Sequence, residues 1–298
     1  MVEDADPLGK RLKKIKPSYK VTKYLKKLIE NEPCIKRQFV PSIEELDVCS
    51  EDLIDPLEEE EHLVTSKCVH KYPDRVLIWC TNVCFANCRF CTRRRYIKKR
   101  ETTITDTEVD KIVEYLAEHQ EVRDVILSGG DPLILNNSQL KSILTKLRKV
   151  ESVKIIRIGT RAPIVFPKRI TNKLVSMLSK FKPLYMNIHV NHPAELTDEV
   201  KHACDLLADN GIVLGSQTVL LKGVNDNQGV MRDLLQKLLE FRIRPYYLYL
   251  ADRVQGTRHF WTEVEDGSKI LRFLQGAIGG LSLPKFVRDT AAGKIHLV

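Results

Sequence analysis

Three cysteines, Cys84, Cys88 and Cys91, lie close together in the spacing C-x3-C-x2-C. Three thiolates are one ligand short of a closed tetrahedral zinc site or of a fully ligated Fe4S4 cluster. Three soft ligands on one short loop suit a cubane iron–sulfur cluster in which one iron is left open. An open metal position is typical of a catalytic site rather than a structural one. The spacing therefore favours an enzyme.

A structural zinc knuckle is the alternative interpretation of the three cysteines. It would need a fourth cysteine or histidine at a second short spacing, and no nearby pair supplies one. His70 precedes the neighbouring apolar run, and Cys80 ends that run. We interpret Cys80 as a buried strand residue and the other cysteines as reduced thiols.

A second motif, Leu127-Ser-Gly-Gly-Asp-Pro132, ends the next apolar run. Gly129 and Gly130 would let the backbone approach a ligand closely. The carboxylate of Asp131 could receive a ligand ammonium group. The motif is also a common turn, but its position one strand–helix unit after the cysteines favours a shared site.

The composition is that of an ordinary globular protein, with 298 residues, 43 % of them hydrophobic and 29 % charged. This length suffices for one large α/β domain with a sizeable core. No stretch approaches the roughly 18 consecutive apolar residues of a membrane span. The N-terminus lacks the charged and apolar regions of a secretory signal. We therefore expect a cytoplasmic protein without a membrane segment.

The net charge of +9 is concentrated in residues 10–27 and 93–100. A basic arm can bind nucleic acid. No aromatic-rich platform or helix-turn-helix pattern accompanies the charge. We therefore interpret it as a solvated helix and a pocket for anionic cofactors, and we do not expect nucleic acid as a partner.

Short apolar runs recur along the chain, with amphipathic segments between them. The predicted strands are Arg75–Trp79, Val122–Leu127, Val153–Ile158, Leu184–His189, Ile212–Val219 and Arg244–Leu250. The predicted helices are 107–118, 138–147, 173–178, 199–208 and 230–241. After the first gap the strands are roughly 30 residues apart, the spacing of a βα unit. Their nearly continuous apolar character indicates strands that are covered on both faces.

We therefore predict an α/β fold with a parallel (β/α)6 sheet curled into a partial TIM-like barrel, whose site lies at the C-terminal strand ends. Three segments are expected: a helical extension over 1–65, the partial barrel over 66–280 and a C-terminal segment over 281–298. Within the extension, the run Ser42-Ile-Glu-Glu-Leu46 predicts a capping box that opens a helix.

Several motifs, in order along roughly residues 60 to 298, are informative when they are taken together. They are His70–Val76, Cys88–Arg95, Leu127–Pro132, Arg157–Arg161, Asn191–Pro193, Gln217–Asp226 and Pro245–Tyr247. Together they resemble the radical S-adenosylmethionine (SAM) superfamily and, more narrowly, the lysine 2,3-aminomutase family. The run Asp252–Phe260 is similar to the branch that makes β-lysine for modifying elongation factor P.

The resemblance implies three cofactors: a 4Fe-4S cluster, SAM and pyridoxal 5′-phosphate (PLP). It implies hydrogen abstraction from L-lysine by a 5′-deoxyadenosyl radical and migration of the amino group to give β-lysine. In such enzymes the cofactors carry the difficult chemistry, and the protein supplies ligands and orientation. The resemblance also implies an electron donor such as flavodoxin or ferredoxin, and it allows a homo-oligomer.

The resemblance implies cofactor roles for particular residues at matching positions. The cluster would be held by Cys84, Cys88 and Cys91. SAM would be contacted by Gly129, Gly130, Asp131, His192 and Gln217. The PLP phosphate would meet Arg75 and Lys71, and PLP itself would be bound through Lys294.

Three further residues would bind the substrate. Arg93 would receive the carboxylate, because the planar guanidinium suits bidentate pairing. Asp252 and Asp289 would bind the distal ammonium group of lysine, which two carboxylates can neutralise. His259, near Asp252, is interpreted as structural.

Two other functions remain open. One is a related radical enzyme that acts on glutamate or another amino acid, or that lacks PLP. A glutamate-specific relative should carry non-acidic or basic groups where this chain has Asp252 and Asp289, so these residues favour lysine. The other is a non-enzymatic, basic metal-binding protein that contacts nucleic acid.

Overall fold

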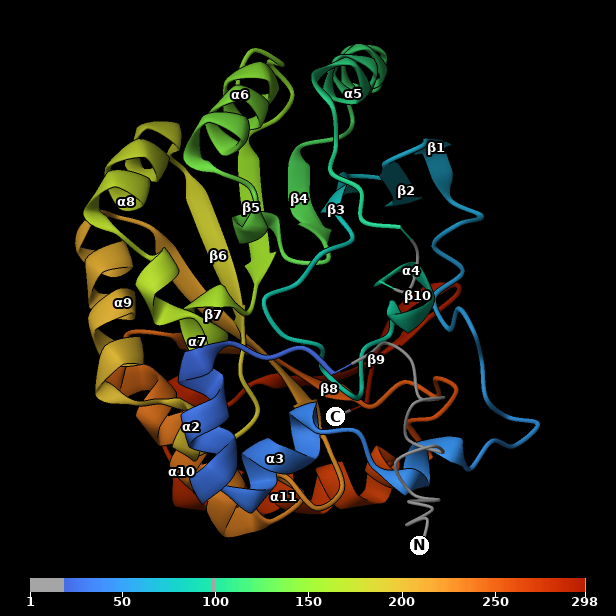
Figure 1. The fold of residues 1–298 in the computed structure, drawn as a ribbon, viewed down its shortest axis with the longest axis vertical. Helices are drawn as coiled ribbons and strands as arrows, with labels where there is room; N and C mark the ends of the chain where they lie inside the picture. The colour runs from blue at the N-terminus through green and yellow to red at the C-terminus, as the bar shows by residue number, and fades with distance from the viewer. Residues whose placement is uncertain (1–18, 98–99, 298) are drawn as a thin grey trace, which may run out of the picture.

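The computed structural model describes residues 19–97 and 100–297, in which ten strands form one sheet in the order β1 to β10 (Figure 1). The strands are β1 Leu63–Thr65, β2 Cys68–Tyr72, β3 Arg75–Thr81, β4 Asp124–Gly129, β5 Ile155–Thr160, β6 Leu184–His189, β7 Val213–Leu220, β8 Arg244–Leu250, β9 Lys285–Thr290 and β10 Gly293–His296. Parts of both basic stretches, residues 10–18 and 98–99, lie outside the described residues.

The α-helices surround this sheet or lie at one end of it. They are α2 Lys23–Asn31, α3 Pro33–Phe39, α4 Arg94–Ile97, α5 Asp106–Glu118, α6 Asn137–Leu147, α7 Ala162–Val165, α8 Asn172–Leu178, α9 Asp198–Asp209, α10 Gln228–Glu240 and α11 Val264–Ala277. Among the described residues, no helix is both long enough and apolar enough to cross a membrane.

The strands from β3 to β9 all run parallel, and antiparallel partners flank them at both edges. The sheet is open, so the prediction of an α/β partial barrel is confirmed. All six predicted strands are present. The parallel strand β9 was not predicted, because only Phe286 and Val287 in it are buried and it lacks an apolar run.

Two of the predicted strands, β4 and β5, begin two residues later than their apolar runs. Val122 and Val153 are buried in the turns that precede the strands. At the other end, the strands continue into the small residues Gly129 and Thr160. The apolar run therefore marks the buried segment, whereas the strand itself extends to the site.

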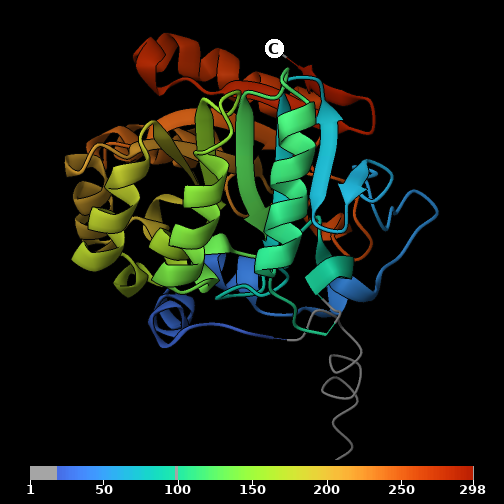
Figure 2. The ribbon, with the colours of Figure 1, turned by 90° about the horizontal axis from the view of Figure 1, so that it is seen from above.

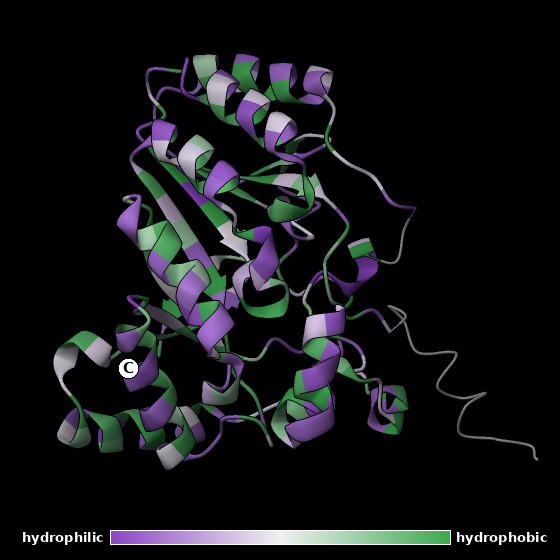
Figure 3. Ribbon diagram, turned by 60° about the vertical axis from the view of Figure 1, so that its left-hand side comes forward, coloured by the Kyte–Doolittle hydropathy of each residue, from purple (hydrophilic) through white to green (hydrophobic). Residues whose placement is uncertain are grey.

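The predicted helices are also present, and they cover the outer face of the sheet (Figure 2). Hydrophobic and hydrophilic residues alternate along these outer helices (Figure 3). Thr105 and Asn136 form capping boxes at the starts of α5 and α6. Side-chain caps satisfy backbone N–H groups that a helix leaves unpaired at its start.

The N-terminal segment lies across the C-terminal ends of the strands (Figures 1 and 2). The Thr22 hydroxyl donates to the Val165 carbonyl of α7 at 2.5 Å. The backbone N–H of Arg89 donates to the Gln38 carbonyl of α3 at 2.8 Å. The predicted capping box at Ser42 is present, but it opens a single 3-10 turn over Ile43–Leu46. The extension thus covers the end of the sheet that carries the cysteines.

Candidate active site

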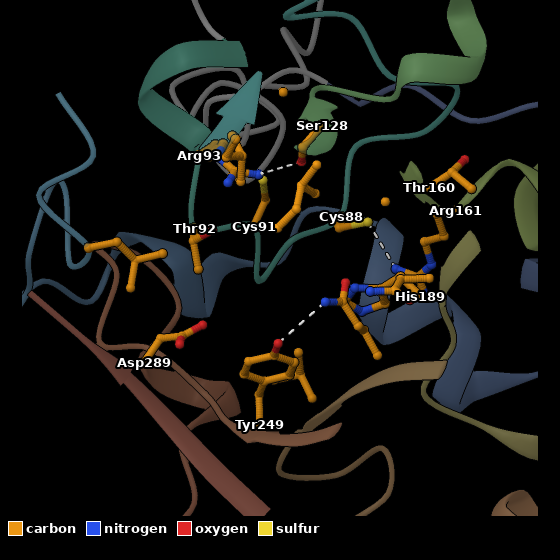
Figure 4. A pocket seen from close by; sticks show the side chains of 18 of the residues that line it. Cys88, Cys91, Thr92, Arg93, Ser128, Thr160, Arg161, His189, Tyr249 and Asp289 are labelled. Carbon is orange, nitrogen blue, oxygen red and sulfur yellow. Dashed lines mark hydrogen bonds between the residues drawn. The ribbon is translucent and has the colours of Figure 1, made fainter. Parts of the chain in front are cut away.

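A cavity of about 490 Å³ opens at the C-terminal ends of the strands (Figure 4). Nearly all the residues predicted for the site line it. They are Cys84, Cys88, Cys91, Gly129, Gly130, Asp131, Gln217, Arg75, Lys71, Arg93, Asp252, Asp289 and Lys294. Their convergence from separate strands and loops is the main result of the tertiary structure at this site.

The three cysteines lie on the loop that follows β3, and each is half-buried. Burial, followed by the nearby Cys91 sulfur, holds the pKa of Cys84 well above its ordinary value. Burial and then Cys88 raise the pKa of Cys91 to about 11. The sulfurs are therefore close enough to interact electrostatically. Arg161 Nη1 donates to Cys88 Sγ at 2.9 Å, so a cationic donor faces this sulfur.

The zinc alternative finds no further support. In the part of the chain that the structure describes, no three His, Cys, Asp or Glu side chains are grouped closely enough to hold one metal ion. An Fe4S4 cubane carries its cysteines on separate irons, so it does not require such close grouping. Cys80 is fully buried in β3 and does not line the cavity, as predicted for a strand residue.

A buried group of ion pairs holds the cysteine loop in place. The carboxylate of Glu45 accepts from Arg89 Nε at 2.8 Å and from Arg89 Nη2 at 2.7 Å. It also accepts from Arg94 Nη2 at 2.5 Å, and Arg94 Nη1 donates to the Gly256 carbonyl at 2.9 Å. Because Arg89 lies between Cys88 and Cys91, this cluster fixes the backbone that carries both thiols.

The glycines at the end of β4 allow a close approach of two backbones. Gly129 has φ of 112°, a conformation that side-chain-bearing residues rarely adopt. A Cβ atom at Gly130 would lie 2.3 Å from the Val83 carbonyl oxygen. The cysteine loop and the glycine turn therefore pack directly on each other.

Asp131 lines the cavity, and its carboxylate accepts hydrogen bonds from within the protein. It accepts from the Thr160 hydroxyl at 2.7 Å, from the Leu133 N–H at 3.0 Å and from the Arg161 N–H at 2.9 Å. Burial raises its pKa. In this structure Asp131 joins the ends of β4 and β5, and the neighbouring glycine backbone borders the cavity.

His192, the histidine predicted to contact SAM, has partners within the protein. Its Nδ1 lies 3.2 Å from the Ala194 N–H and 3.3 Å from Cys34 Sγ, and the residue is not among those that line the cavity in the described structure. His189, at the end of β6, lies there instead. Its ring stacks on Phe90 with 5.3 Å between centroids, and burial holds its pKa well below the ordinary value.

Lys294 is held among aromatic and acidic groups on the far side of the cavity. Its Nζ donates to the Tyr249 hydroxyl at 2.8 Å and lies 3.3 Å from Asp289 Oδ1. Lys294 and Asp289 are register partners in the β9–β10 pair. Burial lowers the pKa of Lys294. Burial, and then Asp289, raise the pKa of Asp252 to about 7.

Two predicted phosphate contacts have protein partners in this structure. Lys71 Nζ donates to the Leu57 carbonyl at 3.0 Å and to the Thr290 carbonyl at 2.5 Å. The guanidinium of Arg75 stacks 3.9 Å from the centre of the Tyr72 ring. Both residues nevertheless line the cavity, so they bring positive charge to its wall.

Arg93 has a partner that the sequence did not indicate. Its Nε and Nη2 donate to the two oxygens of Glu59 at 2.8 and 2.5 Å, and Nη1 donates to the Ser128 hydroxyl at 3.2 Å. Burial opposes the charge of Arg93, but Glu59 raises its pKa. One edge of the guanidinium is thus occupied, and Nη1 lies beside Ser128, another cavity residue.

Four residues of the site were missed as functional candidates: Glu59, Arg161, His189 and Tyr249. Arg161 and His189 lie at or just after strand ends, where a polar residue next to an apolar run is a detectable signal. Glu59 lies in an acidic run that resembles a linker, so only its contact with Arg93 identifies it. Tyr249 lies within a predicted strand, and the direction of its side chain could be seen only in the folded sheet.

The residues present fit the implied cofactors. Cys84, Cys88 and Cys91 provide three thiols, and the glycine turn provides a backbone surface. Within the described residues, Arg161 Nε and His189 Nε2 are buried without a hydrogen-bond partner. Buried polar atoms without partners are costly, and a bound ligand can satisfy them.

Comparisons with known proteins show which family the chain resembles. A family model described as the radical SAM superfamily matches residues 80–235. The chain is 45 % identical to the L-lysine 2,3-aminomutase of Fusobacterium nucleatum over 92 % of its own length and 65 % of that protein. It is 39 % identical to the glutamate 2,3-aminomutase of Clostridioides difficile, over 92 % and 65 % of the two chains. The chain thus spans about two thirds of the length of these relatives.

The fold also resembles that of a solved radical SAM protein. The crystal structure of a radical SAM methyltransferase from Sphaerobacter thermophilus superimposes with a TM-score of 0.56 at 16 % identity. The match covers 76 % of this chain and 72 % of that one. At this identity the comparison supports the architecture alone.

Proposed function

We propose that this chain, which belongs to the radical SAM superfamily and within it to the lysine 2,3-aminomutase family, interconverts L-lysine and β-lysine. One observation carries the proposal. Three thiols suited to a cluster, a lysine suited to PLP and two carboxylates suited to an ammonium group all line one cavity. None of these groups would suffice alone.

Cys84, Cys88 and Cys91 would hold the 4Fe-4S cluster. SAM would bind beside them, against Gly129, Gly130 and Gln217, and we assign the histidine contact to His189 rather than His192. When bound, the cluster and SAM supply a 5′-deoxyadenosyl radical that abstracts hydrogen from the substrate. The stacking of His189 on Phe90 supports its role as a wall of the SAM site.

Lys294 would bind PLP, with Arg75 and Lys71 near the phosphate. The lowered pKa of Lys294, caused by burial, favours the neutral amine that a nucleophile needs. The Tyr249 hydroxyl holds Nζ in position. These contacts orient the amine toward a cavity that several cationic side chains border.

Asp252 and Asp289 would bind the distal ammonium group of substrate lysine, and Arg93 its carboxylate. In this structure Asp289 Oδ1 lies 3.3 Å from Lys294 Nζ, and both carboxylates line the cavity. Two carboxylates suit one ammonium group, which matches lysine, and they would repel the side-chain carboxylate of glutamate.

Glutamate 2,3-aminomutation is the second candidate, because a glutamate 2,3-aminomutase is among the similar proteins. The two activities are separable by anaerobic incubation with SAM, dithionite and PLP and either amino acid. We expect β-lysine from lysine and little product from glutamate. Conversion of glutamate alone would overturn the proposed roles of Asp252 and Asp289. Cys88→Ser, which removes a cluster thiol, serves as the inactive control.

The proposal extends to partners and location. The cluster would need single electrons from a small redox protein such as flavodoxin or ferredoxin. We propose a cytoplasmic location, supported by eight cysteines that are all free thiols. A homo-oligomer is compatible with the proposal, and sedimentation of the reconstituted protein would test it.

A further inference from the structure

One guanidinium connects the cysteine loop to a buried carboxylate. Arg161 follows β5 and is only 7 % exposed. Its Nη1 donates to Cys88 Sγ at 2.9 Å, and its Nη2 donates to Glu195 Oε2 at 2.8 Å (Figure 4 shows the contact with Cys88). We propose that Arg161 raises the reduction potential of the cluster at Cys88 and that Glu195 limits this effect. The inference rests on the proposed cluster.

The guanidinium is held rigidly by groups other than the cysteine. Arg161 Nη2 also donates to Gln38 Oε1 at 2.6 Å. The Phe39 and Phe90 rings lie 4.4 and 5.5 Å from the guanidinium carbon. The Nη2 side therefore suffices to fix the side chain in the fold. Nη1 is directed at the sulfur, where it can act on the cluster.

Glu195 is equally fixed. It is fully buried, and its Oε1 accepts from Gln38 Nε2 and from the N–H groups of Asn191 and His192, each at 3.0 Å. Its Oε2 is left for Arg161. The carboxylate thus lies behind the guanidinium on the side away from the sulfur, and its charge opposes that of the cation.

The direction of the effect follows from electrostatics. Reduction adds one electron to the cluster, and no bond at Cys88 forms or breaks. A cationic donor to a cluster thiolate stabilises the more negative, reduced state, and hydrogen bonds to the sulfurs are among the factors that set such potentials. Burial strengthens the interaction because the local dielectric is low. The Glu195 charge acts in the opposite sense.

The cysteine loop does not depend on Arg161 for its shape. Glu45 holds Arg89 and Arg94 on the other side of the loop, through contacts of 2.5 to 2.8 Å. Removal of the Arg161 side chain should therefore leave three thiols in place. This independence allows a change of potential to be measured on an intact cluster.

The test is a redox titration of the anaerobically reconstituted full chain with dithionite as the reductant. The electron paramagnetic resonance signal of the reduced cluster is followed without lysine or PLP. We expect Arg161→Met to lower the equilibrium constant for reduction of the cluster about tenfold. This corresponds to a fall of ~59 mV in the reduction potential for one electron. Glu195→Gln should shift the potential upward. Arg148→Met is the matched control, since Arg148 donates to the Phe181 and Pro183 carbonyls, away from the cysteines.

An unchanged potential in Arg161→Met with full iron content would overturn the proposal. If Arg161→Met loses its cluster, the reduction potential of Glu195→Gln decides the question. A higher potential than in the wild type supports the proposal, and an unchanged or lower potential refutes it. A merely structural pair would not shift the two variants in opposite directions. Because no amino acid is present, failure of the aminomutase proposal would leave this result unaffected.

Discussion

Arg93 and Glu59 form a two-point ion pair, with Nε–Oε2 at 2.8 Å and Nη2–Oε1 at 2.5 Å. Glu59 is buried, and burial raises the pKa of its carboxyl, but the charge and hydrogen bonds of Arg93, together with the charges of Arg95 and Lys71, lower it, so that the net shift is downward. The pair turns Nη1 toward Ser128 and the cavity. We infer that Glu59 positions Arg93 to receive the substrate carboxylate.

The first prediction concerns Glu59→Gln. Removal of one charge from a buried pair leaves the other uncompensated, so we expect a loss of about 3 kcal/mol in the free energy of unfolding. The KM for lysine should also rise, because Arg93 is no longer oriented. Urea unfolding and steady-state assays measure the two effects.

The neighbouring Glu60→Gln is the control for this prediction. Glu60 accepts from Arg95 Nε at 3.3 Å and is about half exposed. A surface pair contributes roughly 0–1 kcal/mol. Equal effects of the two substitutions would contradict a special role for Glu59.

The second prediction concerns Gly130→Ala. The added Cβ would lie 2.3 Å from the Val83 carbonyl oxygen and 2.7 Å from other Val83 backbone atoms, so the cysteine loop must shift. Overpacking of this kind costs about 1–3 kcal/mol. We expect lower stability and lower iron content after reconstitution.

Gly159→Ala provides the comparison one strand away. There the added Cβ would make only ordinary contacts at 3.8 and 3.9 Å. Iron content should remain at the wild-type value. If Gly130→Ala also keeps full iron, the close packing of the glycine turn and the cysteine loop is not needed for the cluster.

The third prediction concerns Lys294→Ala. Loss of the amine should abolish the visible absorption band of lysine-bound PLP and its trapping by borohydride. Lys285→Ala, at an exposed position on β9, should retain both. Peptide mass spectrometry after reduction identifies the modified lysine. Modification at any other lysine would refute the assignment.

The fourth prediction concerns pH. Burial and then Asp289 raise the pKa of folded Asp252 to about 7, whereas an unfolded aspartate titrates near ~3.9. Between these values the folded state binds the additional proton. The contribution of Asp252 to stability is therefore present at low pH and is lost as pH rises through about 7.

Lysine binding should show the opposite trend, because an ionised Asp252 attracts the ammonium group. We expect both trends to weaken in Asp252→Asn and to persist in Asp233→Asn, at an exposed position on α10. Calorimetric titration and unfolding across this pH range measure them. If lysine binding keeps the same pH dependence in Asp252→Asn, Asp252 does not bind the substrate.

Much of the fold could be predicted because its signals are local. Buried parallel strands are nearly continuous apolar runs, and α5 and α6 begin at polar caps. The strand β9 could not be found this way. It pairs with β8 and β10, and its Phe286 ring packs against Gly267 of α11, contacts that no local signal shows.

The sequence by itself determined the three-cysteine loop, the glycine turn and their order on successive strands, because spacing and residue type are properties of the chain. Only the tertiary structure decided the partners. It joined Arg93 to Glu59 and Arg161 to Cys88, and it brought His189 rather than His192 to the cavity. Charge pairing and side-chain direction depend on residues far apart in sequence, and their contacts exist only once the sheet has curled.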